Sequence, residues 1–174
     1  MRELKQLGTT YLIFNGAMHS RYEHSLGAAH LADYQMKQIR KKQGHLMNDF
    51  RNSETKPLER LVVIAGLCHD LGHGPYSHLF DHYVVPAIRP DLKGIWSHEK
   101  GSIQLFEDLV DKNNIDLEQE DIKLIQDLIS GYDPKTCFDY TESNPLFLIN
   151  REKNLYLTLL TINVTRLMWI NMIT

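Results

Sequence analysis

Several features that would point to other classes of protein are scarce in this 174-residue chain. Its two cysteines, Cys68 and Cys137, form no CxxC pair and are too few for a disulfide scaffold, which favours a reducing intracellular setting, the nucleus or the cytoplasm. Residues 1–8 contain no apolar run of the kind that a signal peptide needs. The net charge of −3 argues against strong non-specific binding of nucleic acid. A nucleic-acid partner is therefore not indicated, although a local basic patch would still be compatible with one.

Sequence patterns typical of β-strands are also nearly absent. Only residues 9–14 suggest a short strand, and the chain has no internal repeat or low-complexity segment. Helix start signals are frequent instead: Ser20 and Glu23 have the spacing of a capping box, and Pro57 suits the first position of a helix. We therefore expect an all-α fold, with helices from Ser20 to Gly44, from Pro57 to Gly72, from Pro75 toward Arg89, from Ser97 through Val110, and at residues 117–129.

The abundant residue is histidine, of which the chain has nine, five of them between residues 69 and 98. A single histidine is as often a surface or core residue as a functional one, but a cluster favours metal binding or acid–base chemistry. His69 and Asp70 are expected on the last turn of an apolar helix, where a carboxylate is costly to bury unless a cation compensates it. Imidazole nitrogen and carboxylate oxygen suit divalent Fe, Zn or Mn. At this point a hydrogen bond between the two residues, without a metal, remains the simpler alternative.

The residues around this pair strengthen the metal interpretation. Gly72 and Gly74 allow a sharp turn, which would aim His73 and His78 into the same space. A third ligand is expected from His24, because helices that pack in a bundle commonly contribute ligands to a shared core.

Four segments make the similarity to a known family specific: residues 5–8, 19–27, 65–78 and 97–102. They read KQLG, HSRYEHSLG, AGLCHDLGHGPYSH and SHEKGS, in that order along the chain. With them, residues 4–131 resemble the catalytic core of the SAM and HD domain-containing deoxynucleoside triphosphate triphosphohydrolases and of related HD-family dGTPases. The resemblance implies an HD-domain helical bundle.

The resemblance also implies a role for each residue of the site. The metal ligands would be His24, His69 and Asp70. The groups around the phosphates would be His73, His78 and His98, with His78 the acid for the leaving group and Asp81 its orienting partner. The substrate contacts would be Arg21 on a phosphate, and Gln6 and Leu7 against the sugar and base.

The implied reaction is hydrolysis of a dNTP, with dGTP as the leading substrate. Water activated by the divalent metal attacks the α-phosphorus, cationic groups neutralise the developing charge, and a deoxynucleoside and triphosphate are formed. Mg would accompany the nucleotide. Members of the family assemble as nucleotide-activated homo-oligomers, which we do not expect of this fragment.

The C-terminal residues depart from the family pattern. The fourth metal ligand of the family is a second aspartate, in a motif like Asn-Lys-Arg-Asn-x-Ile-Asp-Val-Asp-Lys-Tyr-Asp-Tyr, but this chain has no aspartate after Tyr140. Back-translation of residues 161–165 and 168–174, read one frame over, permits Asn-Lys-Arg-Asn and then Val-Asp-Lys-Tyr-Asp-Tyr. Our hypothesis is a frameshift near Asn154. Residues 1–153 would then be a partial, truncated HD phosphohydrolase domain of impaired activity, and residues 154–174 an aberrant tail.

The tail is apolar enough to resemble a membrane span, but Asn163, Arg166 and Asn171 make insertion costly, so no membrane partner is expected.

Two other functions stay open. One is an inactive pseudoenzyme fragment that only binds metal or nucleotide. The other is an HD phosphohydrolase for cyclic or alarmone nucleotides, which the Gln6-Leu7 pair and the histidine set disfavour.

Overall fold

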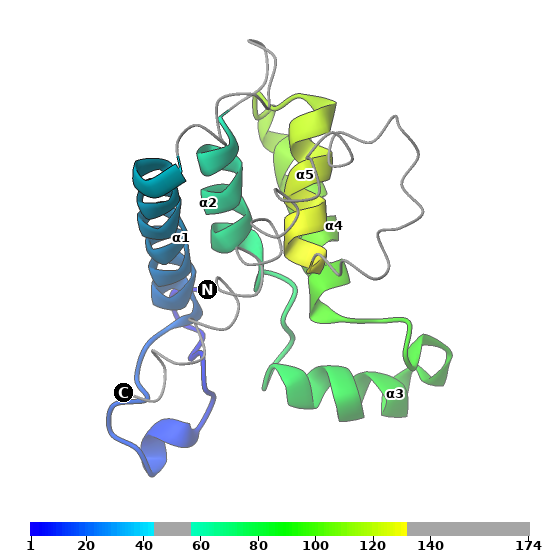
Figure 1. The fold of residues 1–174 in the computed structure, drawn as a ribbon. Helices are drawn as coiled ribbons and strands as arrows, with labels where there is room; N and C mark the ends of the chain where they lie inside the picture. Colours follow the sequence, from blue (N-terminus) through cyan, green and yellow to red (C-terminus); the bar gives the residue numbers. More distant parts are fainter. Residues whose placement is uncertain (44–56, 132–174) are drawn as a thin grey trace. The chain divides into compact units, whose positions relative to one another are not determined.

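The computed structural model describes residues 1–43 and 57–131 (Figure 1). Its elements are η1 (Thr10–Leu12), α1 (Arg21–Gln43), α2 (Leu58–Cys68), the π-helical turn η3 (Phe80–Val84), α3 (Val85–Ile88), η4 (Pro90–Leu92), α4 (His98–Asn113) and α5 (Gln119–Ser130). The described residues form no β-strand, only one isolated bridge between Lys5 and Ser20. The all-α fold class is thus confirmed. Cys137, the proposed boundary at residue 153 and the tail lie outside the described residues.

No helix in the described ranges combines the length and the apolar character that crossing a membrane requires.

The start of α1 follows from the capping box that the sequence predicts. The Ser20 amide donates to Glu23 Oε2 at 2.6 Å, and the Glu23 amide donates in return to Ser20 Oγ at 3.2 Å. These two bonds satisfy backbone groups that the first turn of a helix leaves unpaired. They also fix the first turn, which carries Arg21 and His24.

The segment before α1 is folded back on it. Residues 9–14, expected as a strand, instead contain the 3-10 turn η1, in which the Thr10 hydroxyl donates to the Leu7 carbonyl at 2.7 Å. Around the Lys5–Ser20 bridge, the Gln6 amide donates to the His19 carbonyl at 3.1 Å and the Arg21 amide donates to the Leu4 carbonyl at 2.8 Å. This short antiparallel contact holds Gln6 beside the first turn of α1.

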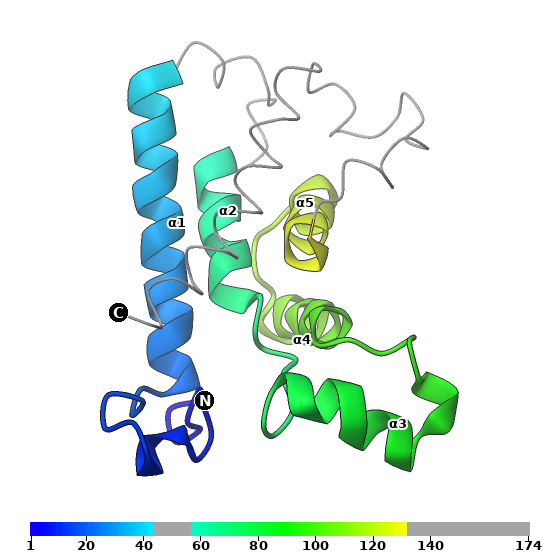
Figure 2. The same ribbon diagram turned by 60° about the horizontal axis from the view of Figure 1, so that its bottom comes forward.

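The chain divides into two compact units, each described by itself. The first unit comprises residues 1–27 and 67–116, and the second comprises residues 28–66 and 117–174. In the second unit, α1 and α2 lie side by side (Figures 1 and 2). A Cβ atom at Gly66 would lie only 3.4 Å from the Ala28 carbonyl oxygen and the Ala32 Cβ, so small residues allow this close approach. One hydrophobic cluster of buried residues in this unit consists of Ala32, Met36 and Val62.

The first unit contains the His-Asp sequence, and here two helix boundaries differ from the prediction. Helix α2 ends at Cys68, so that His69 and Asp70 lie in the turn after the helix and not on its last turn. The next helical segment begins at His78 and not at Pro75. The later start follows from the backbone conformation: Tyr76 and Ser77 have φ values of +64° and +55°, a left-handed conformation that a right-handed helix cannot contain.

The turn after α2 is fixed against the start of α4 by Ser102. This side chain is fully buried; its hydroxyl accepts from the Gly72 amide at 2.8 Å and donates to the His69 carbonyl at 2.6 Å. The backbones also touch, because a Cβ atom at Gly72 would lie 2.3 Å from the His98 carbonyl oxygen. Since Ser97 caps α4 as predicted, its hydroxyl accepting from the Lys100 amide, His98 stands at the first position of α4 beside this turn.

We expect Ser102→Ala to lower the free energy of unfolding by about 1–3 kcal/mol, because it leaves the partly buried Gly72 amide without this acceptor. Gly72→Ala should cost more, since the atoms in its way belong to backbone and cannot rotate aside. Urea unfolding followed by circular dichroism measures both. Gly27→Ala is the matched control: nothing lies within 4 Å of its added Cβ, and alanine should stabilise α1 by up to about 1 kcal/mol. Unchanged stability of Ser102→Ala would contradict the role of this contact.

Candidate metal centre

Three side chains with metal-ligating atoms converge in the first unit. His24 comes from the first turn of α1, whereas His69 and Asp70 come from the turn after α2. His24 Nε2 lies 3.1 Å from Asp70 Oδ2, and His69 Nε2 lies 2.9 Å from Asp70 Oδ1. One ligand atom from each of the three residues lies within 4.8 Å of those of the other two. The predicted convergence of His24 with the His-Asp pair is therefore present in the structure.

These distances fit a divalent metal ion. Two ligand atoms that each lie about 2.1 Å from one ion, at a right angle, are about 3.0 Å apart. The observed 2.9 and 3.1 Å spacings match this value, and they suit hydrogen bonds equally well. The three side chains are nearly buried, with exposed fractions of 11% for His24, 16% for His69 and 9% for Asp70. Two imidazoles and one carboxylate are a donor set suited to Fe, Zn or Mn.

The electrostatics of Asp70 favour its charged form. Burial raises the pKa of this carboxyl, but the hydrogen bonds from His24 and His69, and the nearby His69 and His73 rings, lower it by more. The pKa of Asp70 therefore lies far below its usual range. A carboxylate that stays ionised when buried is the form that a metal ion needs.

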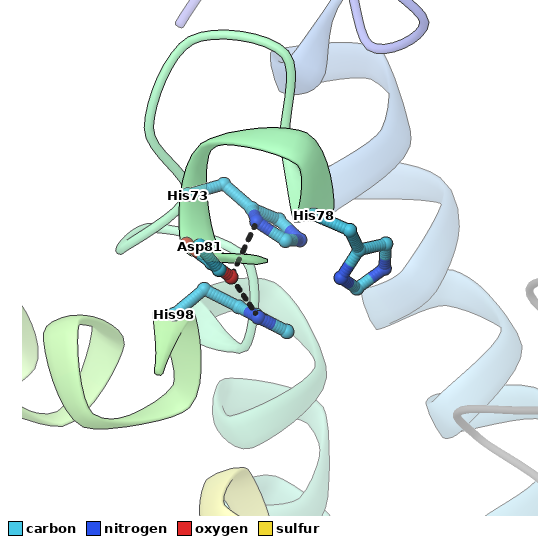
Figure 3. A group of neighbouring side chains, drawn as sticks. All are labelled: His73, His78, Asp81 and His98. Carbon is cyan, nitrogen blue, oxygen red and sulfur yellow. Dashed lines mark hydrogen bonds and ion pairs between the residues drawn. The ribbon is translucent and has the colours of Figure 1, made fainter. Parts of the chain in front are cut away.

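A second group, His73, His78, Asp81 and His98, lies in the same unit (Figure 3). The rings of His73 and His98 stack with centroids 3.8 Å apart, and the His78 ring stands edge-on to both, at 5.0 and 5.1 Å. Asp81 Oδ2 lies 2.9 Å from His98 Nδ1 and 3.9 Å from His73 Nδ1. The structure thus brings together the three histidines that the resemblance placed around the phosphates, and Asp81 with them.

The two stacked rings differ in their surroundings. Burial, together with the positive charges of His98, Arg21 and His78, lowers the pKa of His73 to about 4 against the opposing effect of Asp70. His98 instead has a carboxylate at each ring nitrogen, because Glu99 Oε1 lies 3.2 Å from its Nε2. We conclude that His73 is neutral near pH 7. Glu99 was missed by sequence reasoning, although it directly follows His98.

Asp81 has a hydrogen-bond partner that the sequence did not predict. Its hydrogen bond goes to His98, whereas the sequence assigned it to orient His78. That orienting role stays a prediction, because His78 belongs to the same group of ligand-type atoms within 4.8 Å. Buried polar atoms without a hydrogen-bond partner among the described residues remain in the group, namely His73 Nδ1 and Asp81 Oδ1. Such atoms are unfavourable unless a bound molecule or water satisfies them.

Arg21 is a buried cation, with a relative exposure of 5%. Its Nη2 donates to Ser77 Oγ at 2.5 Å, its Nη1 is buried without a partner, and it forms no ion pair with the described carboxylates. Burial lowers the pKa of Arg21, while Asp70 and Asp81 act against that shift. A guanidinium with an unsatisfied donor is suited to bind an anion such as a phosphate group.

Of the two residues predicted to contact sugar and base, Gln6 is buried and Leu7 is half-buried. Gln6 Nε2 donates to Asp70 Oδ2 at 3.1 Å, so this side chain touches a residue of the metal group. The sequence contains no signal for that contact, since the two residues are 64 positions apart.

Comparison with known proteins gives consistent results. The HD domain family matches residues 21–159. The deoxynucleoside triphosphate triphosphohydrolase SAMHD1 of Bos taurus is 42% identical over 139 residues, which cover 75% of this chain and 22% of that protein. The Homo sapiens protein of the same name is 44% identical over 139 residues, covering 75% and 21%, and the Dictyostelium discoideum homolog is 41% identical over 134 residues, covering 75% and 24%. The chain spans about a fifth to a quarter of the length of these relatives.

Proposed function

We propose that this chain, which belongs to the HD domain family, carries the metal-dependent site of a deoxynucleoside triphosphate triphosphohydrolase. The observation that carries the proposal is the convergence, within one unit, of His24, His69 and Asp70 with a second group of three histidines. The similar proteins that bear the name of this activity support the choice of a dNTP as substrate. By resemblance, dGTP is the leading candidate.

The residues would divide the reaction as follows. His24, His69 and Asp70 would hold a divalent ion, Fe, Zn or Mn, which supplies Lewis acidity and activation of water when bound. Arg21 would bind a phosphate oxygen through its free Nη1 donor. The products would be a deoxynucleoside and triphosphate, and Mg would enter with the nucleotide.

The second group would serve the phosphates and the leaving group. The neutral and buried His73 side chain would donate a hydrogen bond from its ring N–H to a phosphate oxygen. The imidazole of His98, which Asp81 and Glu99 hold in place, would lie beside the His73 ring. His78 would hold the proton that passes to the 5′-oxygen of the deoxynucleoside when the bond to the α-phosphorus breaks.

The test is product analysis after incubation with dGTP and Mn²⁺, with triphosphate and deoxyguanosine separated by ion-exchange chromatography. It should use both the chain as it stands and a chain in which the second frame is restored after Lys153. The proposal expects triphosphate from the restored chain. Turnover of cyclic or alarmone nucleotides in place of dNTPs would assign the site to another HD phosphohydrolase. No turnover of any nucleotide by either chain would identify an inert fragment.

Restoring that frame should also raise the metal content. The chain has no aspartate after Tyr140, and the alternative frame supplies a second aspartate of the kind that serves the family as a fourth ligand. A further charged ligand should strengthen the binding of a divalent ion. Elemental analysis of both chains, purified identically, measures the effect, and equal metal occupancy would contradict the role of that aspartate as a fourth ligand.

A further inference from the structure

Gln6 has a buried and well-fixed position beside the metal group. Its relative exposure is 7%, and its backbone amide donates to the His19 carbonyl at 3.1 Å. On the other side of the Lys5–Ser20 bridge, the Arg21 amide donates to the Leu4 carbonyl. The same short contact therefore fixes Gln6 and the start of α1, which carries His24 three residues later.

The orientation of the Gln6 amide is set by chemistry. Its Nε2 lies 3.1 Å from Asp70 Oδ2, and only the NH₂ group of an amide can donate to a carboxylate. The carbonyl oxygen Oε1 must then point away from Asp70, and it is buried without a hydrogen-bond partner in the part of the chain that the structure describes. An unpaired buried oxygen is unfavourable, so the hydrogen bond to Asp70 has to stabilise this orientation of the Gln6 amide.

Asp70 has several hydrogen-bond donors around it. His69 Nε2 faces Oδ1 at 2.9 Å, and His24 Nε2 faces the same Oδ2 as Gln6, at 3.1 Å. A ring nitrogen that binds a metal ion uses its lone pair for the ion and cannot donate to the carboxylate as well. When His24 and His69 serve as ligands, both contacts to Asp70 lose their hydrogen bonds. The Gln6 amide keeps its own, because it is not a ligand.

We propose that Gln6 is a positioning residue of the metal centre, whose side-chain amide holds the Asp70 carboxylate in place for the ion. This inference rests on the proposed function, because it requires the metal group. It gives Gln6 a role beyond contact with the sugar. Partners of this kind orient metal ligands, and their removal commonly weakens metal affinity by about 10–100-fold.

The experiment is a titration with Co²⁺ alone, followed by calorimetry and by the visible d–d absorption of the bound ion. Gln6→Met keeps the length of the side chain and its unbranched shape but removes the amide. We expect this variant to bind Co²⁺ about 10–100-fold more weakly, with an altered d–d spectrum. Wild-type affinity together with a wild-type spectrum would overturn the proposal.

Two further variants separate this role from others. Thr10→Ala removes the hydroxyl contact to the Leu7 carbonyl in the same segment and should leave Co²⁺ affinity unchanged. If it weakened binding as much as Gln6→Met, general loosening of residues 1–18 would explain the effect and the proposal would fall. His24→Ala removes a proposed ligand and should abolish binding. If the unaltered chain bound Co²⁺ and His24→Ala bound it equally well, the proposed function itself would be contradicted. If only Gln6→Met bound Co²⁺ with normal affinity, only this inference would be contradicted.

One measurement on the unaltered chain does not depend on whether Gln6→Met folds. Co²⁺ is paramagnetic, and the Gln6 NH₂ group is one carboxylate away from the proposed ion. In ¹⁵N spectra its side-chain amide signals should shift strongly or broaden as Co²⁺ is added. Gln6 amide signals that stay in place at saturating Co²⁺ would refute the contact.

Discussion

Asp70→Ala is expected to abolish metal binding and triphosphate release together, in the chain with the restored frame. Asp70 lies between His24 and His69 and carries the only carboxylate of that group among the described residues. Because its pKa is held far below the usual range, it supplies a full negative charge at neutral pH. Loss of a charged ligand should weaken divalent-metal affinity by more than the roughly 100-fold that loss of an outer partner can cost.

Calorimetry with Mn²⁺ and chromatographic assay of triphosphate from dGTP measure the two losses in parallel. Asp108→Ala is the matched control, because Asp108 is an exposed aspartate of the same unit that pairs with Lys112 in α4. It should keep both properties. If Asp70→Ala kept its metal and lost only its activity, Asp70 would act on the substrate and would not be a ligand.

Helix boundaries could be predicted where the signal is local. The capping box of Ser20 and Glu23, the Ser97 cap of α4 and the end of α5 before Gly131 each depend on residues a few positions apart. The segment between α2 and α4 is different. The left-handed conformation of Tyr76 and Ser77 could not be predicted from the sequence, because neither residue is a glycine.

That segment is shaped by contacts made far from it in sequence. Ser77 accepts a hydrogen bond from Arg21, and Ser102 binds the turn at Gly72 from the first turns of α4. Neither partner is visible from the composition of residues 69–77. The end of α2 at Cys68, four residues before the expected stop at Gly72, belongs to the same set of contacts, since Ser102 also binds the His69 carbonyl.

The candidate site shows the same division. Its residue types could be chosen from the sequence, because the chemistry of metal and phosphate restricts them to histidine, aspartate and arginine. Its hydrogen bonds could not: the bond from Gln6 to Asp70 and the bond between Asp81 and His98 have no signal in the sequence. Resemblance to a family predicts which residues lie together at a site. The partner of each polar atom is settled by packing.

His78→Ala should separate catalysis from metal binding. His78 is not one of the three proposed ligands, and its ring stands edge-on to His73 and His98 at 5.0 and 5.1 Å. Its removal should therefore leave Mn²⁺ affinity unchanged. Loss of a proton donor to a poor leaving group typically costs about 10²–10⁴-fold in rate. In the restored chain, triphosphate release from dGTP should fall by that factor while metal content stays constant.

His82→Ala is the matched control for this variant. His82 lies one helical turn after His78, with ring centroids 6.2 Å apart, and stands outside the group of ligand-type residues. It should keep nearly full activity, which would show that a lost imidazole in this helix is not harmful in itself. Metal loss in His78→Ala would make His78 a ligand, and a rate equal to that of His82→Ala would exclude it as the acid. In the second case the proton for the 5′-oxygen has to come from another group, and His98, whose Nδ1 is bound to Asp81, would be the next to replace.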